Sequence, residues 1–153
     1  MLLAGCTTAA DYSFNSDGSC DGVRVVVDFA LLQESNIDNC VAIEGQSANA
    51  LDVLLDAGVV TQGTLAYGDQ VICRVNDLPS SSEPFTVTGE QPYLESCQDM
   101  PPAFAYWALW VINDSALGWE YAMEGVSSLK LQKGQSIGMA FSTGGLTPNP
   151  DGN

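Results

Sequence analysis

Alternating apolar and polar positions predict that this chain folds mainly into β-strands. Residues 22–29 show the pattern most clearly, because Val23, Val25, Val27 and Phe29 fall on one face. β-branched residues spaced two apart are typical of a strand with one buried face. Further strands are predicted at residues 70–75, 85–88, 103–112, 118–123 and 136–142, and in the last of these Ile137, Met139 and Phe141 fall on one face.

One helix is predicted at residues 47–58. Ser47 is a suitable N-cap, and Gly58 can adopt the left-handed conformation that ends many helices. The apolar side of this helix is formed by three leucines, Leu51, Leu54 and Leu55. A strand, then a helix, then several strands indicate an α+β domain in which a mainly antiparallel sheet packs on one helix.

The first residues resemble a bacterial lipoprotein cleavage site. Two leucines and two small residues precede a cysteine in the run Leu2-Leu3-Ala4-Gly5-Cys6. We interpret residues 1–5 as the remnant of a lipoprotein signal peptide and Cys6 as the residue that carries lipid after cleavage. The alternative is that this run matches by accident.

The chain has the length and composition of one globular domain. It contains 153 residues, of which 46% are hydrophobic, and has no apolar run of the roughly 18 residues that a spanning helix needs. We assign residues 22–143 to the domain. Residues 6–21 are rich in small and polar side chains and are predicted to form a flexible tether, and residues 144–153 a mobile tail.

The charge of the chain is strongly negative. There are 19 Asp and Glu against 4 Lys and Arg, for a net charge of −15. Such a surface repels phosphate backbones, which excludes nucleic acid as a partner. The acidity is explained either by solubility or by loose cation binding, and the scattering of the acids along the sequence favours solubility.

The absence of histidine argues against an enzyme. Without histidine, the common catalytic triads and most zinc sites are not available. The remaining enzymatic hypothesis is a carboxylate pair across a cleft, as in glycosidases, drawn from Asp28, Glu120 and Glu124. We predict no catalytic residue, no metal site and no required cofactor.

Four cysteines remain if Cys6 carries lipid. They are Cys20, Cys40, Cys73 and Cys97. An even number of cysteines in an exported chain indicates two disulfides and an extracytoplasmic location. Three pairings are possible, and sequence proximity favours Cys20–Cys40 and Cys73–Cys97.

Aromatic residues gather in one part of the chain and form the candidate binding surface. They are Tyr106, Trp107, Trp110, Trp119 and Tyr121. In a strand, Tyr106 and Trp110 lie on one face and Trp107 on the other. Because a sheet packed on one helix has one fully buried face, we expect at least one tryptophan on the less buried side, where it would bind a ligand or partner. The alternative is that all of them belong to the core.

These segments together resemble a known family. The most specific parts are Cys97 followed by Pro101-Pro102 and then by Tyr106-Trp107. The chain resembles secreted, especially actinobacterial, members of the transcobalamin-like C-terminal domain family. The resemblance implies a β-grasp-like domain that is exported and often anchored at the cell surface. It also implies a corrinoid as a ligand, which vitamin carriers of this family hold together with a separate helical domain.

The leading functional hypothesis is a lipid-anchored, extracytoplasmic bacterial binding domain at the cell surface. Its partner would be a small ligand or an envelope protein, and its attachment to the membrane would be the lipid on Cys6. The alternative is a structural surface protein that associates with its own copies or packs on envelope proteins.

Anchoring is directly testable. When the chain is expressed behind a full signal peptide, Cys6→Ser is expected to move the protein from the membrane fraction to the soluble fraction, because the lipid attachment site is lost. Fractionation followed by immunoblotting measures the change. A mutant that fractionates like the wild type would show that Cys6 is not the anchor.

Overall fold

The computed structural model describes residues 13–144 and residue 150. This part of the chain is mostly strand, with one short helix. In chain order the elements are β1 (Val23–Asp28), the 3-10 turn η1 (Ala30–Leu32), β2 (Ile37–Val41), β3 (Ser47–Asn49), α1 (Ala50–Asp56), β4 (Thr61–Thr64), β5 (Gly68–Val75), β6 (Tyr106–Ile112), β7 (Glu120–Tyr121), β8 (Lys130–Gln132) and β9 (Ser136–Ser142).

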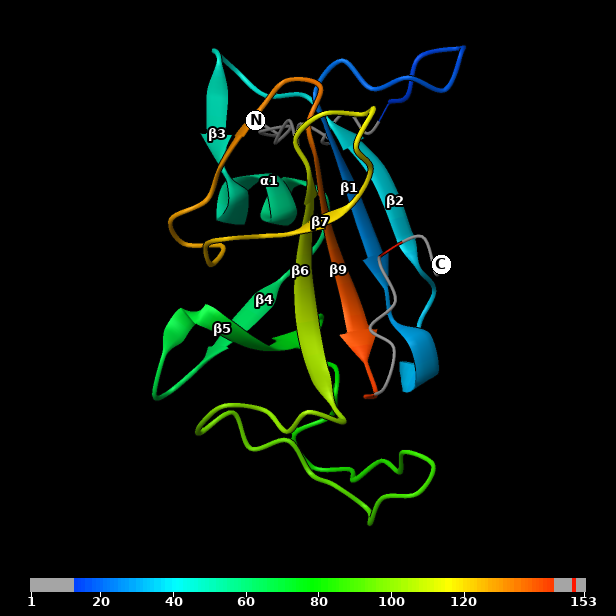
Figure 1. Cartoon of the computed structure of the whole chain (residues 1–153), viewed down its shortest axis with the longest axis vertical. Coiled ribbons are helices and arrows are strands. Elements are labelled where there is room, and N and C mark those ends of the chain that lie inside the picture. The colour runs from blue at the N-terminus through cyan, green and yellow to red at the C-terminus, as the bar shows by residue number, and fades with distance from the viewer. Residues whose placement is uncertain (1–12, 145–149, 151–153) are drawn as a thin grey trace, which may run out of the picture.

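A five-stranded sheet forms the centre of the fold. Its strand order is β2-β1-β9-β6-β7, and two small two-stranded sheets, β3-β8 and β4-β5, lie beside it (Figure 1). β1 and β9 are parallel, and the other neighbouring pairs are antiparallel. The expectation of a mainly antiparallel sheet with one helix is therefore confirmed.

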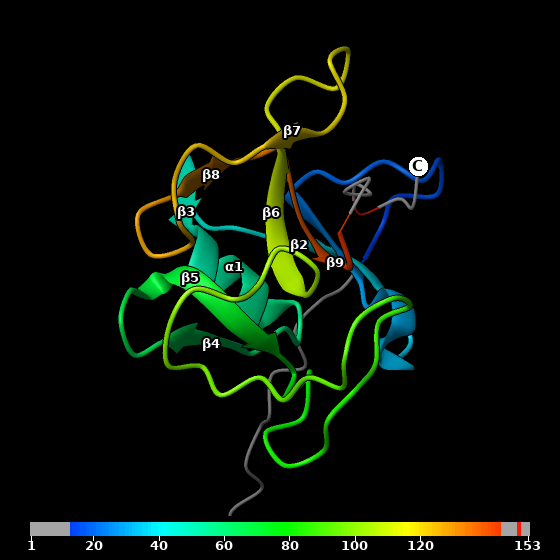
Figure 2. The same cartoon turned by 60° about the horizontal axis from the view of Figure 1, so that its bottom comes forward.

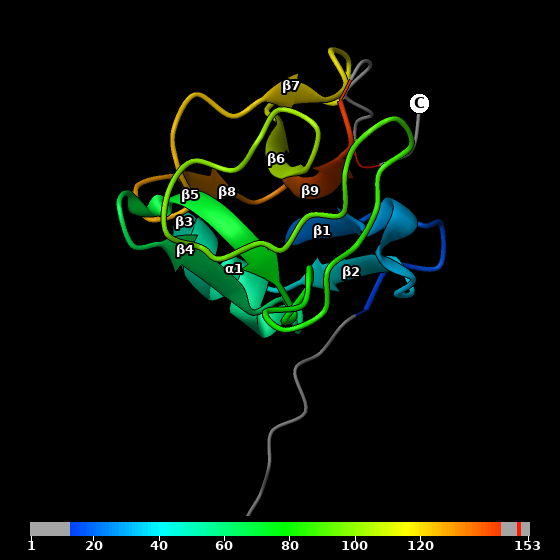
Figure 3. The same ribbon diagram turned by 90° about the horizontal axis from the view of Figure 1, so that it is seen from below.

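One face of this sheet packs against α1. Val25 and Val27 of β1 and Ile137 and Met139 of β9 are fully buried and belong to one core cluster with Leu54 of the helix. Figure 3 shows α1 and the β4-β5 hairpin on the same side of the five strands. The alternation predicted for β1 and β9 thus identifies the core face correctly.

The helix is shorter than predicted, and its N-cap is different. It begins at Ala50, and the side chain of Asn49 accepts a hydrogen bond from the Leu51 N–H. Ser47 is not the cap, because Ser47–Asn49 pair with Lys130–Gln132 as β3 and β8. Leu55 is 62% exposed, so the buried side is formed instead by Ala50, Val53 and Leu54. Gly58 has the predicted left-handed backbone, with φ 79°.

The other face of the sheet is covered as well. Ala108, Trp110 and Ala140 form a second buried cluster there, with Trp119 packed against it. At Gly138, a Cβ would lie 2.2 Å from the Cγ of Pro150 and 3.0 Å from the Trp119 ring, so only glycine fits. Pro150 is buried and belongs to the predicted tail, whose residues 145–149 and 151–153 lie outside the described residues.

Two disulfides have the predicted pairing. Cys20 is bonded to Cys40 and Cys73 to Cys97, with S–S distances of 2.00 and 2.02 Å. They indicate an oxidising, extracytoplasmic environment. Within the described residues, no helix is long and apolar enough to cross a membrane. The predicted lipidation site Cys6 and residues 7–12 of the predicted tether lie outside the described residues.

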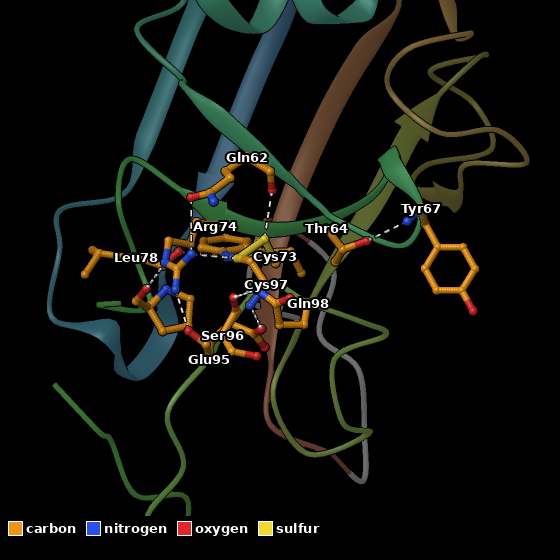
Figure 4. Close-up of a disulfide and its surroundings, with 12 residues drawn as sticks. Gln62, Thr64, Tyr67, Cys73, Arg74, Leu78, Glu95, Ser96, Cys97 and Gln98 are labelled. Atoms are coloured by element: carbon orange, nitrogen blue, oxygen red, sulfur yellow. Dashed lines mark hydrogen bonds between the residues drawn. A yellow bond between two sulfur atoms is a disulfide. The ribbon is translucent and has the colours of Figure 1, made fainter. Parts of the chain in front are cut away.

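The long connection between β5 and β6 is held by a buried arginine (Figure 4). The Arg74 guanidinium donates to the Pro79 carbonyl at 2.9 Å, to the Gln62 side chain at 3.2 Å, and to the carbonyl of Glu95. It also donates to the sulfur of Cys97, whose disulfide partner is the residue before Arg74. These contacts hold Pro79, Glu95 and Cys97 of this connection in place. The strand predicted at residues 85–88 is reduced to one bridge, between Phe85 and Tyr93.

The carboxylate of Glu95 is buried beside this cluster. It accepts hydrogen bonds from the Tyr93 hydroxyl at 2.9 Å and from the Cys97 N–H at 2.6 Å. Burial, the hydrogen bond to Glu95 and the negative charge of Glu95 raise the pKa of Tyr93 to about 12. The phenol of Tyr93 is therefore held in its neutral form.

Arg74→Met is expected to lower the free energy of unfolding by about 3 kcal/mol, because it leaves several buried acceptors without a donor. Arg24→Met is the matched control. Arg24 forms an ion pair with Asp38 at 2.8 Å that is partly exposed, and such pairs contribute less than about 1 kcal/mol. Urea unfolding of both variants measures the difference. Equal losses would show that the Arg74 cluster does not hold the fold.

The raised pKa of Tyr93 predicts a loss of stability at alkaline pH. An unfolded tyrosine titrates near pH 10, so the stabilisation from Tyr93 is complete below about pH 10 and is lost as the pH rises through 12. Ultraviolet absorbance is expected to show a tyrosine transition near pH 12 that Tyr93→Phe removes. The idea is wrong if Tyr93→Phe leaves that transition in place.

Candidate functional site

A hollow of about 770 Å³ opens between β6 and the start of β5. Its walls are residues 69–72 of β5, residues 106–109 of β6 and residues 121–126, which are the end of β7 and the segment after it. Met100, Pro101, Ala103, Met139 and Gly144 complete the lining. We call this hollow the methionine groove, because three of the four methionines of the chain line it.

The groove exists because β7 is short. β7 pairs only with Trp110 and Val111 of β6. One further hydrogen bond between the two segments follows, from the Ala122 N–H to the Leu109 carbonyl at 3.0 Å. β7 is also the last strand of the sheet on this side. Figure 2 shows β7 beside one end of β6 only. The first half of β6 therefore has β9 as a neighbour on one side and the groove on the other.

The segment after β7 turns away from β6 and closes the groove against β5. Gly125 comes so near to Gln70 that a Cβ would lie 2.7 Å from the Gln70 Cα. The Gln70 side chain also donates to the Ser127 hydroxyl at 2.6 Å. A larger residue at position 125 would push this wall outward and change the width of the groove.

The lining of the groove is apolar, and its rim is acidic. Met100 and Met123 are 59% and 94% exposed, and flexible thioether side chains adapt to ligands of different shape. Asp69 and Glu124 are exposed at the rim, and no Lys or Arg is found among the described lining residues. The groove is therefore suited to an apolar ligand that is neutral or positively charged.

The predicted aromatic surface is divided between the two faces of the sheet. Trp107 faces the main core, where its ring packs edge-on against Phe29 and Phe141, and its Nε1 donates to the Leu78 carbonyl at 3.1 Å. Trp110 faces the other side and stacks on Tyr121, with 3.9 Å between ring centroids. The alternation predicted for this strand is thus confirmed.

The expectation of an exposed tryptophan in β6 is wrong. Trp107 is 7% exposed and Trp110 is 8% exposed. Trp110 is covered because Tyr121 lies opposite it in the β6-β7 pair and because Trp119 packs against the same cluster. The structure brings Tyr106, Trp107 and Tyr121 to the groove and leaves Trp110 and Trp119 out of it.

Of the acidic residues in the enzymatic hypothesis, Asp28 is separated from the other two, whereas Glu120 and Glu124 line a second hollow together with Lys130. β9 and β6 lie between β1, which carries Asp28, and β7, which carries Glu120. The carboxylate of Asp28 instead accepts a hydrogen bond from the Ala30 N–H at 2.8 Å. Glu124 lies at the groove rim. In the described part of the chain, no group of three His, Cys, Asp or Glu side chains could hold a metal ion.

Neither the methionines nor the β5 wall of the groove was predicted from the sequence. Met100 and Met123 lie far from Asp69 and Gln70 in the sequence, and only the fold brings them together. The available signal was weak. It consists of methionines in polar surroundings, beside Pro101-Pro102 and beside Glu124, where a buried side chain is not expected.

Comparison of the chain with protein-family models, with curated proteins and with solved structures finds no match. The function is therefore inferred from the chemistry of the methionine groove.

Proposed function

We propose that this protein is an extracytoplasmic binding domain, anchored by lipid on Cys6, that holds an elongated apolar ligand in the methionine groove. The observation that carries this proposal is the open cavity of about 770 Å³, which falls in the size range of ligand sites and is lined mainly by apolar residues. Exposed methionines at such a site favour binding over packing.

The side chains around the groove support binding rather than catalysis. The titratable groups among the lining residues are the rim acids Asp69 and Glu124 and the phenols of Tyr106 and Tyr121. The groove has no histidine and no thiol, because the chain lacks histidine and its described cysteines form disulfides. General acid-base chemistry normally uses two groups in defined positions, which this rim does not offer.

A β-grasp-like fold and kinship with the transcobalamin-like family belong to the same proposal. They are supported by the parallel central pair of β1 and β9, with α1 packed on one face of the sheet. A corrinoid is then one ligand to test. The methyl groups of its flat macrocycle would contact the apolar lining of the groove.

Self-association is the second candidate function. Met100, Tyr121 and Met123 expose apolar surface on one side of the molecule, and exposed apolar patches on soluble domains often mark interfaces. Sedimentation velocity of the full chain tests this candidate. Dimers that Met123→Asp dissociates would favour it over ligand binding.

Ligand binding in the groove is testable with Nile red, a neutral apolar dye. The wild type is expected to bind the dye, and Met123→Asp is expected to weaken binding about tenfold, because it places a charge where apolar surface would be buried. Leu65→Asp is the matched control, since Leu65 is 76% exposed and lies outside the groove. Fluorescence titration measures both. Equal weakening by the two variants would contradict binding in the groove.

A further inference from the structure

We propose that the ligand of the methionine groove is an extended, basic peptide that adds as a strand to the open edge of β6. The inference rests on the proposed function and specifies its ligand. The open edge is formed by residues 106–108, next to Leu109, whose carbonyl accepts from the Ala122 N–H. The peptide would pair with β6 in line with β7.

The backbone of β6 faces the groove. Residues 106–109 all line the cavity, although their side chains alternate between the two faces of the sheet. Leu109 belongs to the main core cluster and Ala108 to the cluster on the other face. Four consecutive residues can border one cavity only if the cavity lies along the edge of the strand.

The polar groups of this edge point into the groove. The Leu109 carbonyl accepts from the Ala122 N–H, so the backbone groups of Leu109 point away from β9. Groups two residues apart point to the same side of a strand, so the N–H and carbonyl of Trp107 also point toward the groove. Among the described residues, Trp107 has no backbone hydrogen bond outside the sheet ladder.

An added strand would satisfy these groups. Backbone N–H and carbonyl groups that are covered nearly always have hydrogen-bond partners, and an occupant of the groove would cover those of Trp107. A peptide residue opposite Trp107 would donate to its carbonyl and accept from its N–H. Three residues of edge correspond to roughly 10 Å of extended chain, so a short segment of three or four residues is enough.

The side chains of such a peptide would alternate between two apolar walls. On the core side they would meet Leu109, Val126 and Met139, which belong to or pack against the main core. On the other side they would meet Tyr106 and Tyr121. Peptides bound by strand addition are recognised in this way, with the backbone giving affinity and alternate pockets giving specificity.

The charge of the protein selects a basic peptide over a second copy of the chain. The net charge is −15, so two copies repel each other, whereas a basic segment is attracted. Asp69 and Glu124 lie at the groove rim, where they would contact a lysine or arginine next to the bound segment. An apolar stretch flanked by basic residues is therefore the expected ligand.

The test uses the full chain and a fluorescent peptide of alternating valine and threonine with a lysine at each end. We expect the peptide to bind and to slow hydrogen exchange at the Trp107 N–H. The matched control is the same peptide with alternate backbone amides methylated, which keeps the side chains and removes the hydrogen-bond donors. It is expected to bind about tenfold more weakly.

A pair of protein variants tests the rim. Glu124→Gln is expected to weaken peptide binding about threefold, because it removes a rim charge that would contact a lysine of the peptide. Glu90→Gln removes the same charge at an exposed position outside the groove and is expected to leave peptide binding unchanged. For the peptide pair, equal affinities of the methylated and the unmethylated peptide would overturn strand addition.

The two proposals fail in different ways. Nile red binding without peptide binding would overturn the strand-addition proposal and leave the apolar groove as a site for another ligand. Absence of both would overturn both proposals. Dimers that Met123→Asp dissociates and that exclude the peptide would assign the groove to a second copy and overturn the peptide as ligand.

Discussion

The parallel pairing of β1 with β9 is the constraint on which the rest of the structure depends. It joins the first and last strands of the domain, in a register that runs from Arg24 with Ser136 to Asp28 with Ala140. β1 then has β2 as its other neighbour, and β9 has β6. The side of β6 that faces away from β9 therefore becomes the end of the sheet, where β7 covers only its second half. The groove is a consequence of this arrangement.

The shape of the groove also depends on contacts outside the main sheet. Arg74 and the Cys73–Cys97 disulfide hold the connection that carries Met100 and Pro101 to the groove. On the other side, the close approach of Gly125 to Gln70 sets the wall that follows β7. A buried arginine with several acceptors is costly to disturb, so the same cluster that stabilises the fold keeps the groove walls in place.

Aromatic and methionine side chains have separate tasks in this protein. The tryptophans of β6 fill the core on one face and stack beneath Tyr121 on the other. Their surface is used in folding, and little of it remains for a ligand. The exposed side chains at the groove are methionines and a tyrosine. Rigid rings stabilise the sheet, and flexible thioethers form the surface that would adapt to a ligand.

Several features could be predicted from the sequence because they depend on neighbouring residues. The two-residue period of β1 and β9 identified their buried faces, the alternation in β6 separated Trp107 from Trp110, and proximity of the cysteines indicated both disulfides. The helix was predicted too long, because Ser47–Asn49 pair with β8, which lies about eighty positions later in the sequence.

Only the tertiary structure decided which element covers each face of the sheet and where a strand has no neighbour. Alternation shows which residues share a face, but it carries no information about the element that packs on that face. The burial of Trp110 depends on Tyr121 and Trp119, and the open edge of β6 depends on the length of β7. Met100, Met123 and Asp69 meet at one groove because strands distant in sequence lie side by side. Long-range pairing is set by the packing of the whole chain, so the sequence determined the strands and the bridges, and the tertiary structure determined the site.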